Sequence, residues 1–271
     1  MILIFPDIHG RTFWQQAVSD VLHEIIVPDD YVFLGDYLDP YTSQVAQAEA
    51  IINFNKLLAL WQFMPHQELA EDYDKGHMLI GNHDFKYMND TFARRAGGDK
   101  TMRSSYYQVK GIFTDLHDLL HLAYETTVNG RRFLFTHAGV NRDWYARHAD
   151  LIGELTADNL NKLPDTKEGV EALCDIGWRR GGPCDTGGLL WADVDDNDDN
   201  PDGIDYQIFS HSQQPKDPII NDRFAMLDCR RTFVLDDEGK VVDYEDYMQQ
   251  QGLAQQRQPV KPYEPWAPYL R

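Results

Sequence analysis

Cysteine, basic residues and long apolar runs are all scarce in this 271-residue sequence. Cys174, Cys184 and Cys229 form no CxxC pair, so the sequence predicts neither a disulfide framework nor a thiolate zinc site. No stretch approaches the roughly 18 consecutive apolar residues that a membrane-spanning helix needs. The opening run Met1–Phe5 is also too short for a secretory signal. We therefore expect a cytoplasmic protein with reduced thiols and no membrane partner.

Basic residues are outnumbered by acidic ones, 25 to 44, which gives a formal net charge of −19. Nucleic-acid binding requires clustered lysine and arginine to neutralise phosphates, so this balance argues against stable nucleic-acid binding. Clusters of carboxylates favour divalent cations instead. A chain of this length with 42% apolar residues can form one large domain with a well-filled core.

Short apolar runs alternate with helix-spaced apolar residues through the first 80 positions. The runs at 1–5, 31–34 and 77–80 predict strands. The segments at 13–25 and 45–61 have helical spacing, and we expect the second helix to end before Pro65. This alternation predicts an α/β fold. Further on, Asn129-Gly130 separates apolar runs at 122–128 and 132–135 and predicts an antiparallel hairpin.

The remaining segments predict covering helices, a second sheet and a tail. We expect helical covering segments at about 85–120 and 141–175, above the strand ends. Short apolar runs at 207–209, 224–227, 232–235 and 241–244 predict a second sheet. The Gln- and Pro-rich end predicts an extended tail, which the aromatic residues Tyr263, Trp266 and Tyr269 could attach to the body. We therefore predict a catalytic domain over 1–248 and a tail over 249–271.

Polar motifs occur where the apolar runs end. There are six of them, in chain order Asp7-Ile8-His9-Gly10, Gly35-Asp36-Tyr37-Leu38-Asp39, Gly81-Asn82-His83-Asp84, Thr136-His137-Ala138-Gly139, Leu189-Leu190-Trp191-Ala192-Asp193 and Ser210-His211-Ser212. Loops at the carboxyl ends of strands in α/β sheets converge on one crevice. A mixed Asp, His and Asn set suits two borderline metal ions bridged by one carboxylate, for which Asp36 is the natural choice. Two ions about 3.5 to 4 Å apart can hold a phosphoryl group and make hydroxide available near neutral pH.

These motifs resemble those of the calcineurin-like metallophosphoesterases over residues 7–211, and most closely the prokaryotic type of serine/threonine phosphoprotein phosphatase. The resemblance implies a four-layer α/β/β/α sandwich of two mixed sheets. It also implies two metal ions, most commonly Mn or Fe, with Zn as an alternative. The first ion would be held by Asp7, His9 and Asp36, and the second by Asp36, Asn82, His137 and His211.

The same resemblance assigns roles to His83 and Asp39. His83 would donate a proton to the leaving alkoxide, and Asp39 would accept the other ring N–H of His83 and so orient it. A hydroxide that bridges the two ions would attack phosphorus directly, without a covalent phosphoenzyme.

The sequence departs from the family pattern at several positions. Asp39 is followed by Pro40-Tyr41, where the phosphatase branch has an arginine that grips phosphate. Arg180 or Arg179, shortly before the Leu-Leu-Trp motif, could supply this contact, and Arg11 is a weaker candidate. Other departures are an aspartate for the usual glutamate, a serine for a glycine and a glutamine for a possible further histidine ligand; they are Asp84, Ser210 and Gln213.

Three functions fit these observations. The first is hydrolysis of phosphomonoesters, with a phosphorylated protein carrying phosphoserine or phosphothreonine, or a small phosphoester, as the substrate. The second is cleavage of a dinucleoside polyphosphate or another phosphodiester by the same metal centre. The third is a non-catalytic protein whose metal site stabilises an interaction surface, against which the intact His83 and Asp39 argue.

The segment 193–205 contains seven aspartates, and their spacing resembles the start of a calcium-binding loop. Pro201 interrupts the pattern, and Phe209 stands where the glutamate ligand belongs. We interpret the segment as a solvated acidic loop.

Overall fold

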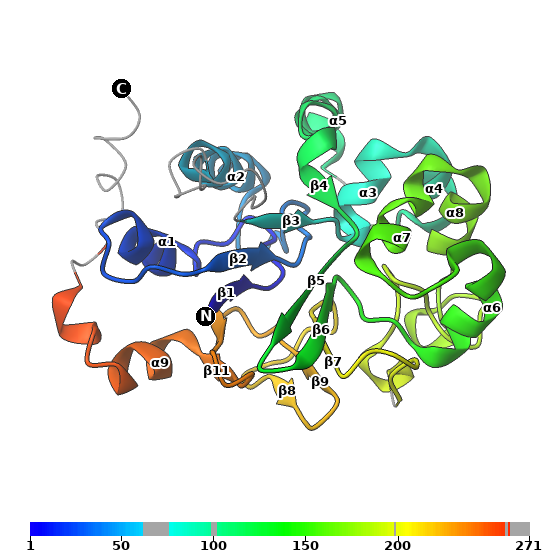
Figure 1. Ribbon diagram of the computed structural model, residues 1–271. Coiled ribbons are helices and arrows are strands. Elements are labelled where there is room, and N and C mark those ends of the chain that lie inside the picture. Colours follow the sequence, from blue (N-terminus) through cyan, green and yellow to red (C-terminus); the bar gives the residue numbers. More distant parts are fainter. Residues whose placement is uncertain (62–75, 99–101, 198, 258–259, 261–271) are drawn as a thin grey trace.

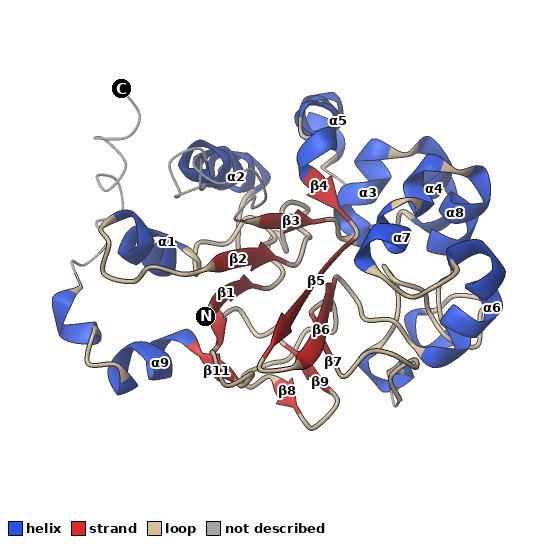
Figure 2. Cartoon of the chain, viewed as in Figure 1, coloured by secondary structure: helices blue, strands red, loops and turns tan. Residues whose placement is uncertain are grey.

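Two mixed β-sheets stack at the centre of the fold, with helices around them (Figures 1 and 2). The computed structural model describes residues 1–61, 76–98, 102–197, 199–257 and 260. The predicted α/β sandwich of two mixed sheets is confirmed. Pro65 and the three tail aromatics, Tyr263, Trp266 and Tyr269, lie outside the described residues.

The first sheet has six strands. In spatial order they are β11 (Val241–Asp243), β10 (Phe233–Leu235), β1 (Ile2–Phe5), β2 (Asp30–Phe33), β3 (His77–Leu79) and β4 (Leu120–His121). Strands β1 to β4 run parallel, and β10 pairs antiparallel with β1, with Leu3 opposite both Tyr31 and Val234. We expected the runs at 232–235 and 241–244 in the second sheet, and this expectation is wrong. Strand β1 is buried on both faces, and β10 covers its otherwise open edge.

The second sheet has five strands. Their order is β5 (Ala123–Val128), β6 (Arg131–Thr136), β7 (Tyr206–Phe209), β9 (Phe224–Met226) and β8 (Ile219–Ile220). The predicted hairpin is confirmed, because β5 and β6 pair antiparallel around Asn129 and Gly130. Both turn residues have positive φ, 49° and 75°, as a two-residue type I′ turn requires.

Nine α-helices occur in the described residues. They are α1 (Gln15–Leu22), α2 (Gln47–Trp61), α3 (Asn82–Met88), α4 (Asp90–Ala96), α5 (Tyr106–Asp115), α6 (Arg142–Ile152), α7 (Ala157–Asn161), α8 (Lys167–Leu173) and α9 (Tyr244–Gln250). Short 3-10 turns lie at Arg103–Ser105, His117–Leu119, Leu163–Asp165, Trp178–Arg180, Val194–Asp196 and Ala254–Gln256. Throughout these described ranges, every helix is too short or too polar to cross a membrane.

Most of the helices fall into two groups (Figure 1). Helices α1 and α2 lie along the first sheet, whereas α3, α4 and α6 to α8 gather at one end of the molecule. The tail expected to be extended from 249 instead continues α9 to Gln250 and then makes a 3-10 turn at Ala254–Gln256. Arg257 attaches this end to the body through a 2.8 Å ion pair with the buried Asp20 of α1.

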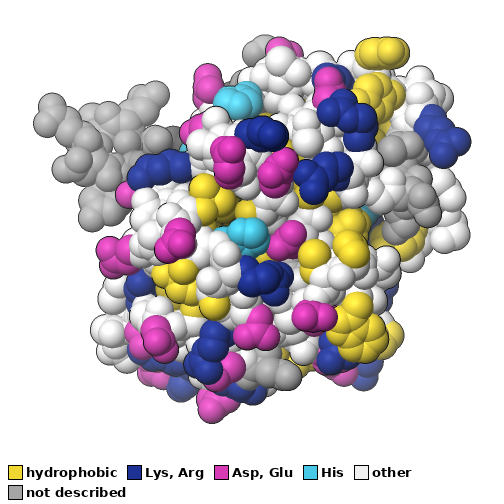
Figure 3. Space-filling view, turned by 90° about the vertical axis from the view of Figure 1, so that its right-hand side faces the viewer, with side chains coloured by type: hydrophobic (Ala, Val, Ile, Leu, Met, Phe, Trp, Pro, Cys, Tyr) yellow, Lys and Arg dark blue, Asp and Glu magenta, His cyan; other side chains and the backbone are white. Residues whose placement is uncertain are grey.

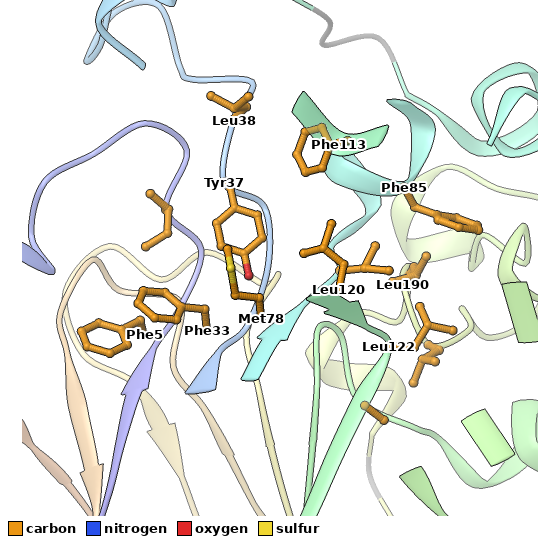
Figure 4. Packing of buried hydrophobic residues seen from close by; sticks show 14 of the residues in the cluster. Phe5, Phe33, Tyr37, Leu38, Met78, Phe85, Phe113, Leu120, Leu122 and Leu190 are labelled. Atoms are coloured by element: carbon orange, nitrogen blue, oxygen red, sulfur yellow. The ribbon is translucent and has the colours of Figure 1, made fainter. Parts of the chain in front are cut away.

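The two faces of each central strand bury apolar side chains in different layers. Ile2 and Ile4 point between the sheets, where they join Phe133 and Ile208 in one buried cluster. The alternate residues of β1 and β2 pack beneath the helices, and Phe5 stacks on Phe33 with ring centroids 4.3 Å apart (Figure 4). Because both faces are dry, the ends of the strands remain as the place where polar groups can gather.

A polar contact links the two sheets at the opposite end of the strands from the polar motifs. Asp30, at the start of β2, accepts hydrogen bonds from His77 Nε2 at 3.0 Å and from the Tyr124 hydroxyl of the second sheet at 2.6 Å. The rings of His77 and Tyr124 stack with centroids 3.6 Å apart. Burial alone would raise the pKa of Asp30, but the hydrogen bond and charge of His77 and the Tyr124 hydroxyl together lower it.

This contact predicts a pH-dependent loss of stability. Because the pKa of Asp30 is lower in the folded protein than in the unfolded chain, where it is about 3.9, ionised Asp30 stabilises the fold at pH values above this unfolded value. This stabilisation is lost as the pH falls through the pKa of the folded state. Asp30→Asn should therefore lower the free energy of unfolding by about 1 to 3 kcal/mol at pH 7, with a smaller difference at pH 3. Urea unfolding of both proteins at the two pH values measures this, and a difference that grows toward low pH would contradict the assignment.

Candidate active site

All six predicted metal ligands lie at the carboxyl ends of strands from both sheets. Asp7 and His9 follow β1, and Asp36 follows β2. Asn82 follows β3 and opens α3, while the remaining two histidines, His137 and His211, follow β6 and β7 of the second sheet. The stacking of the sheets therefore brings together residues that are two hundred positions apart in the sequence.

The first cluster consists of Asp7, His9 and Asp36, whose candidate ligand atoms all lie within 4.8 Å of one another. His9 Nε2 lies 3.7 Å from a carboxylate oxygen of Asp7 and 3.5 Å from one of Asp36. The other ring nitrogen, Nδ1, is 2.9 Å from the backbone carbonyl of Leu38. A carbonyl can only accept, so Nδ1 carries the proton and Nε2 presents its lone pair to the cluster.

The second cluster consists of Asp36, His137 and His211, again within 4.8 Å. His137 Nδ1 donates to the carbonyl of Leu34 at 2.8 Å, so its Nε2 presents a lone pair. That Nε2 faces Asn82 Oδ1 and His211 Nδ1, each at 3.0 Å. Asn82 Nδ2 and His211 Nε2 are buried without a hydrogen-bond partner. Oxygen and nitrogen lone pairs that converge in this way fit a cation between them.

The pKa shifts of Asp36 and His211 both favour binding of a cation. Burial raises the pKa of Asp36 well above its ordinary value, and the charge of Asp7 adds to this. Burial lowers the pKa of His211 well below its ordinary value, with Arg180 and His137 contributing. The site thus disfavours two adjacent carboxylates and favours neutral imidazole. A bound cation would reverse the penalty on the carboxylates, and it needs histidine in the neutral form.

The backbone of these loops is constrained. Among the described residues, seven other than glycine have positive φ, and four of them are the site residues His9, Asp36, Asp39 and His211, at 45°, 52°, 58° and 68°. Such conformations cost of order 1 to 3 kcal/mol each and persist only when the surrounding structure enforces them. The loops therefore hold the side chains in place at a cost to stability.

Two of the loops approach so closely that only glycine fits between them. A Cβ on Gly81 would lie 2.1 Å from Asp36 Oδ1, and a Cβ on Gly35 would lie 2.5 Å from the backbone nitrogen of Gly81. The buried Asp84 carboxylate joins the same loops, because it accepts hydrogen bonds from the backbone of Asp36 at 2.6 Å, Tyr37 at 3.0 Å and Gly81 at 2.9 Å. The sequence pattern singled out Asp84 only as a departure and did not predict this function.

His83 and Asp39 lie beside the clusters in the predicted arrangement. His83 Nδ1 is 3.0 Å from Asp39 Oδ2, and the backbone N–H of His83 donates to Asp36 Oδ1 at 2.9 Å. The hydroxyl of Tyr87 donates to Asp39 Oδ1 at 2.6 Å, and Lys86 ion-pairs with Oδ2. Burial alone would raise the pKa of Asp39, but the hydrogen bond from His83 and the charge of Lys86 lower it. The sequence motifs did not predict a role for Lys86 or Tyr87, although both lie within four residues of His83.

The three candidate phosphate-binding arginines have different surroundings. Arg180 Nε lies 2.8 Å from Asp193 Oδ2, Arg180 Nη2 donates to Ser212 beside His211, and its charge contributes to the pKa shift of that histidine. Arg179 instead pairs with Asp196 of the acidic loop at 3.3 Å and stacks over Trp178.

Arg11 is buried beside the first cluster. Its Nε donates to Gln44 at 3.0 Å, its guanidinium lies over the Tyr41 ring, and Nη1 and Nη2 have no hydrogen-bond partner. The geometry thus links Arg180 to the second cluster and leaves two guanidinium nitrogens of Arg11, Nη1 and Nη2, unpaired near the first.

A further departure from the family pattern, Ser210, has a structural explanation. The Ser210 hydroxyl donates to Asp7 Oδ1 and accepts from the backbone N–H of Asp7 at 3.0 Å, so it orients a predicted ligand.

Asp228 was not predicted from the sequence as a residue of the site. It is buried, and its Oδ1 is unpaired. Burial raises the pKa of Asp228 well above its ordinary value, with the charge of Asp7 adding to this.

The sequence model of the family described as calcineurin-like phosphoesterase matches residues 1–215. The chain belongs to this family. The predicted resemblance is thus confirmed, and the family implies a phosphoesterase whose candidate metal site is formed by the Asp and His clusters described above. No curated protein matches the chain.

Solved structures that match the chain do so at low sequence identity. A cold-active protein tyrosine phosphatase is 13% identical, with a TM-score of 0.50 over 89% of this chain and 78% of the other. A protein serine/threonine phosphatase from Saccharomyces cerevisiae is 16% identical, with a TM-score of 0.39 over 83% and 66%. A hypothetical protein from Pyrococcus horikoshii is 11% identical, with a TM-score of 0.43 over 94% and 96%.

The position of Asp36 in both clusters predicts a large effect on metal binding. Asp36→Asn should lower the Mn²⁺ content of the loaded protein from two ions per chain to one or none, because each cluster loses a charged ligand. Elemental analysis after removal of free metal measures the content. Asp118→Asn, at an exposed position, is the control and should bind as wild type does. Equal metal content in the wild type and Asp36→Asn would refute the shared ligand.

Proposed function

We propose that the chain hydrolyses phosphomonoesters, with phosphoserine and phosphothreonine proteins of the cytoplasm as one substrate class. The observation that carries this proposal is the position of His83 beside the shared carboxylate. Its backbone bonds to Asp36, and its ring lies edge-on to that of His9 with centroids 5.2 Å apart. A candidate proton donor therefore adjoins both candidate metal clusters.

The donor set fits the implied metal ions, as the converging lone pairs of Asn82 and His137 indicate. Asp7, His9 and Asp36 would hold one ion, and Asp36, Asn82, His137 and His211 the other. When bound, two such ions hold a phosphoryl group and make hydroxide available near neutral pH. Mn and Fe are the proposed ions, with Zn as an alternative.

His83 would supply the proton for the leaving alkoxide. Asp39 accepts from Nδ1, which leaves Nε2 to carry the proton that is transferred. A general acid positioned in this way contributes typically about 10²- to 10⁴-fold to the rate. Esters with poor leaving groups, such as phosphoserine, depend most on this proton.

Arg180 would bind the phosphoryl oxygens. Asp193 and Ser212 hold one side of its guanidinium, so the group is oriented before the substrate arrives. On the face shown in Figure 3, basic side chains are interspersed with acidic ones despite the net charge of the chain. An anionic substrate can therefore approach without meeting a uniformly negative surface.

A panel of substrates under Mn²⁺ tests the proposal. p-Nitrophenyl phosphate, its bis-ester, a phosphopeptide and diadenosine tetraphosphate are compared, with Asp36→Asn as the control. We expect wild type to hydrolyse the monoester and the phosphopeptide fastest and Asp36→Asn to be inactive. Preference for the bis-ester or for diadenosine tetraphosphate would favour a phosphodiesterase or a polyphosphate hydrolase. No hydrolysis at all by the metal-loaded protein would favour a non-catalytic metal-stabilised protein.

The two neighbouring arginines should differ in their effect on substrate binding. Arg180→Ala should raise KM for monoesters by about 10- to 10²-fold, the range expected for loss of a charged hydrogen bond. Arg179→Ala is the matched control, since Arg179 pairs with Asp196 and lies over Trp178, whereas Arg180 contacts Ser212 beside His211; it should change KM by less than about threefold. Steady-state kinetics of both variants measure the difference. A larger effect at Arg179 would assign the phosphate contact to that residue instead.

A further inference from the structure

Lys86 is a buried lysine on α3, one turn after His83. Its side chain is 2% exposed, and its Nζ pairs with Asp39 Oδ2 and lies 3.2 Å from His83 Nδ1. Lysine is almost never fully buried unless it is paired, because desolvation of its charge is costly. The desolvation cost of burying Lys86 therefore falls at Asp39, the carboxylate that contacts the candidate proton donor.

The Asp39 carboxylate has three side-chain donors around it. His83 and Lys86 share Oδ2, and Tyr87 donates to Oδ1 at 2.6 Å. The Asp39 backbone has a φ of 58°, a conformation that the loop must enforce. Its neighbour Leu38 accepts from His9, so the same loop also orients a candidate metal ligand.

We propose that Lys86 is a positioning residue for the proton donor, and that its ammonium holds Asp39 Oδ2 opposite His83 Nδ1 so that His83 Nε2 faces the leaving group. This inference rests on the function proposed above. It names a residue outside the six metal-ligand positions and the His83–Asp39 pair that the sequence resemblance supplied.

Lys86 gives Asp39 a second partner beside His83. When His83 has given up its proton, it no longer compensates the buried carboxylate. Lys86 still pairs with Oδ2, so it holds the Asp39 carboxylate in the same orientation. The pKa of Asp39 agrees with this arrangement. Burial alone would raise it, but His83 and Lys86 lower it below its ordinary value.

The experiment compares leaving groups of different basicity. Lys86→Met should lower kcat for phosphoserine by about 10- to 10²-fold, part of the contribution of a general acid, and kcat for p-nitrophenyl phosphate by less than about threefold. KM should stay unchanged for both, because Lys86 is buried away from substrate. Lys86→Arg, which keeps the charge, should restore most of the phosphoserine activity. Lys86→Gln replaces Lys86→Met if circular dichroism shows that the latter does not fold.

Two controls separate positioning from general destabilisation. Lys110→Met removes a lysine that pairs with Asp90 at the surface, and it should leave both substrates unaffected. In a His83→Asn background, Lys86→Met should cause no further loss, because the proton donor is already absent. Equal slowing of both substrates by Lys86→Met, or independent effects in the double variant, would overturn the proposal.

A measurement that needs no activity completes the test. In the Zn²⁺-loaded protein, the proton on His83 Nδ1 should give a downfield NMR signal that is absent in His83→Asn. Lys86→Met should shift or remove this signal, and Lys86→Arg should retain it; an unchanged signal in Lys86→Met would refute the role of Lys86. Wild type inactive on every ester would instead refute the proposed function, and the NMR comparison would still decide whether Lys86 orients the pair.

Discussion

The site depends on the close contact between the loops that follow β2 and β3. Gly35 and Gly81 allow the two backbones to meet, and the Asp36 carboxylate occupies the space where a Cβ of residue 81 would stand. Asp84 ties the loops together through three backbone N–H groups. Asp36 is the member that the two clusters share, so this contact determines where both lie relative to each other.

The same arrangement carries an electrostatic cost. Asp7 and Asp36 are buried next to each other, and burial together with their mutual repulsion raises the pKa of Asp36. Four strained residues add to the cost. Stability supplied elsewhere, by the dry layers on both faces of the strands, must offset it. A site of this kind is expected where function, rather than folding, selects the residues.

The sequence predicted that these residues would converge because they follow a topological rule. Each polar motif comes after an apolar run, and parallel strands place such motifs at one edge whatever the details of packing. Local patterns did not determine which sheet β10 and β11 would join, since strand pairing depends on which edge remains open in the folded chain. They also gave no reason to expect a helix to continue to Gln250.

The burial of Lys86 is a second feature that the sequence pattern could not predict. In the sequence it is an ordinary polar residue of a short helical segment. A lysine in such a segment is most often exposed. Its partner Asp39 is 47 positions away, so only the packed structure reveals that the lysine is buried. Arg179 and Arg180 are adjacent in sequence and equivalent by motif, yet the fold directs them to different carboxylates.

Arginines held by carboxylates of the acidic loop would allow an acidic chain to bind an anionic substrate. The acidic loop accounts for seven of the aspartates, and within its described residues Asp193 and Asp196 bind arginine side chains directly. An arginine held by one carboxylate loses rotational freedom but still presents its other N–H groups. The Asp and His clusters form the candidate metal site that the family implies, whereas the Pro40-Tyr41 replacement differs from the phosphatase pattern. Substrate preference in this chain is therefore expected to depend on Arg180, which Asp193 of the acidic loop orients.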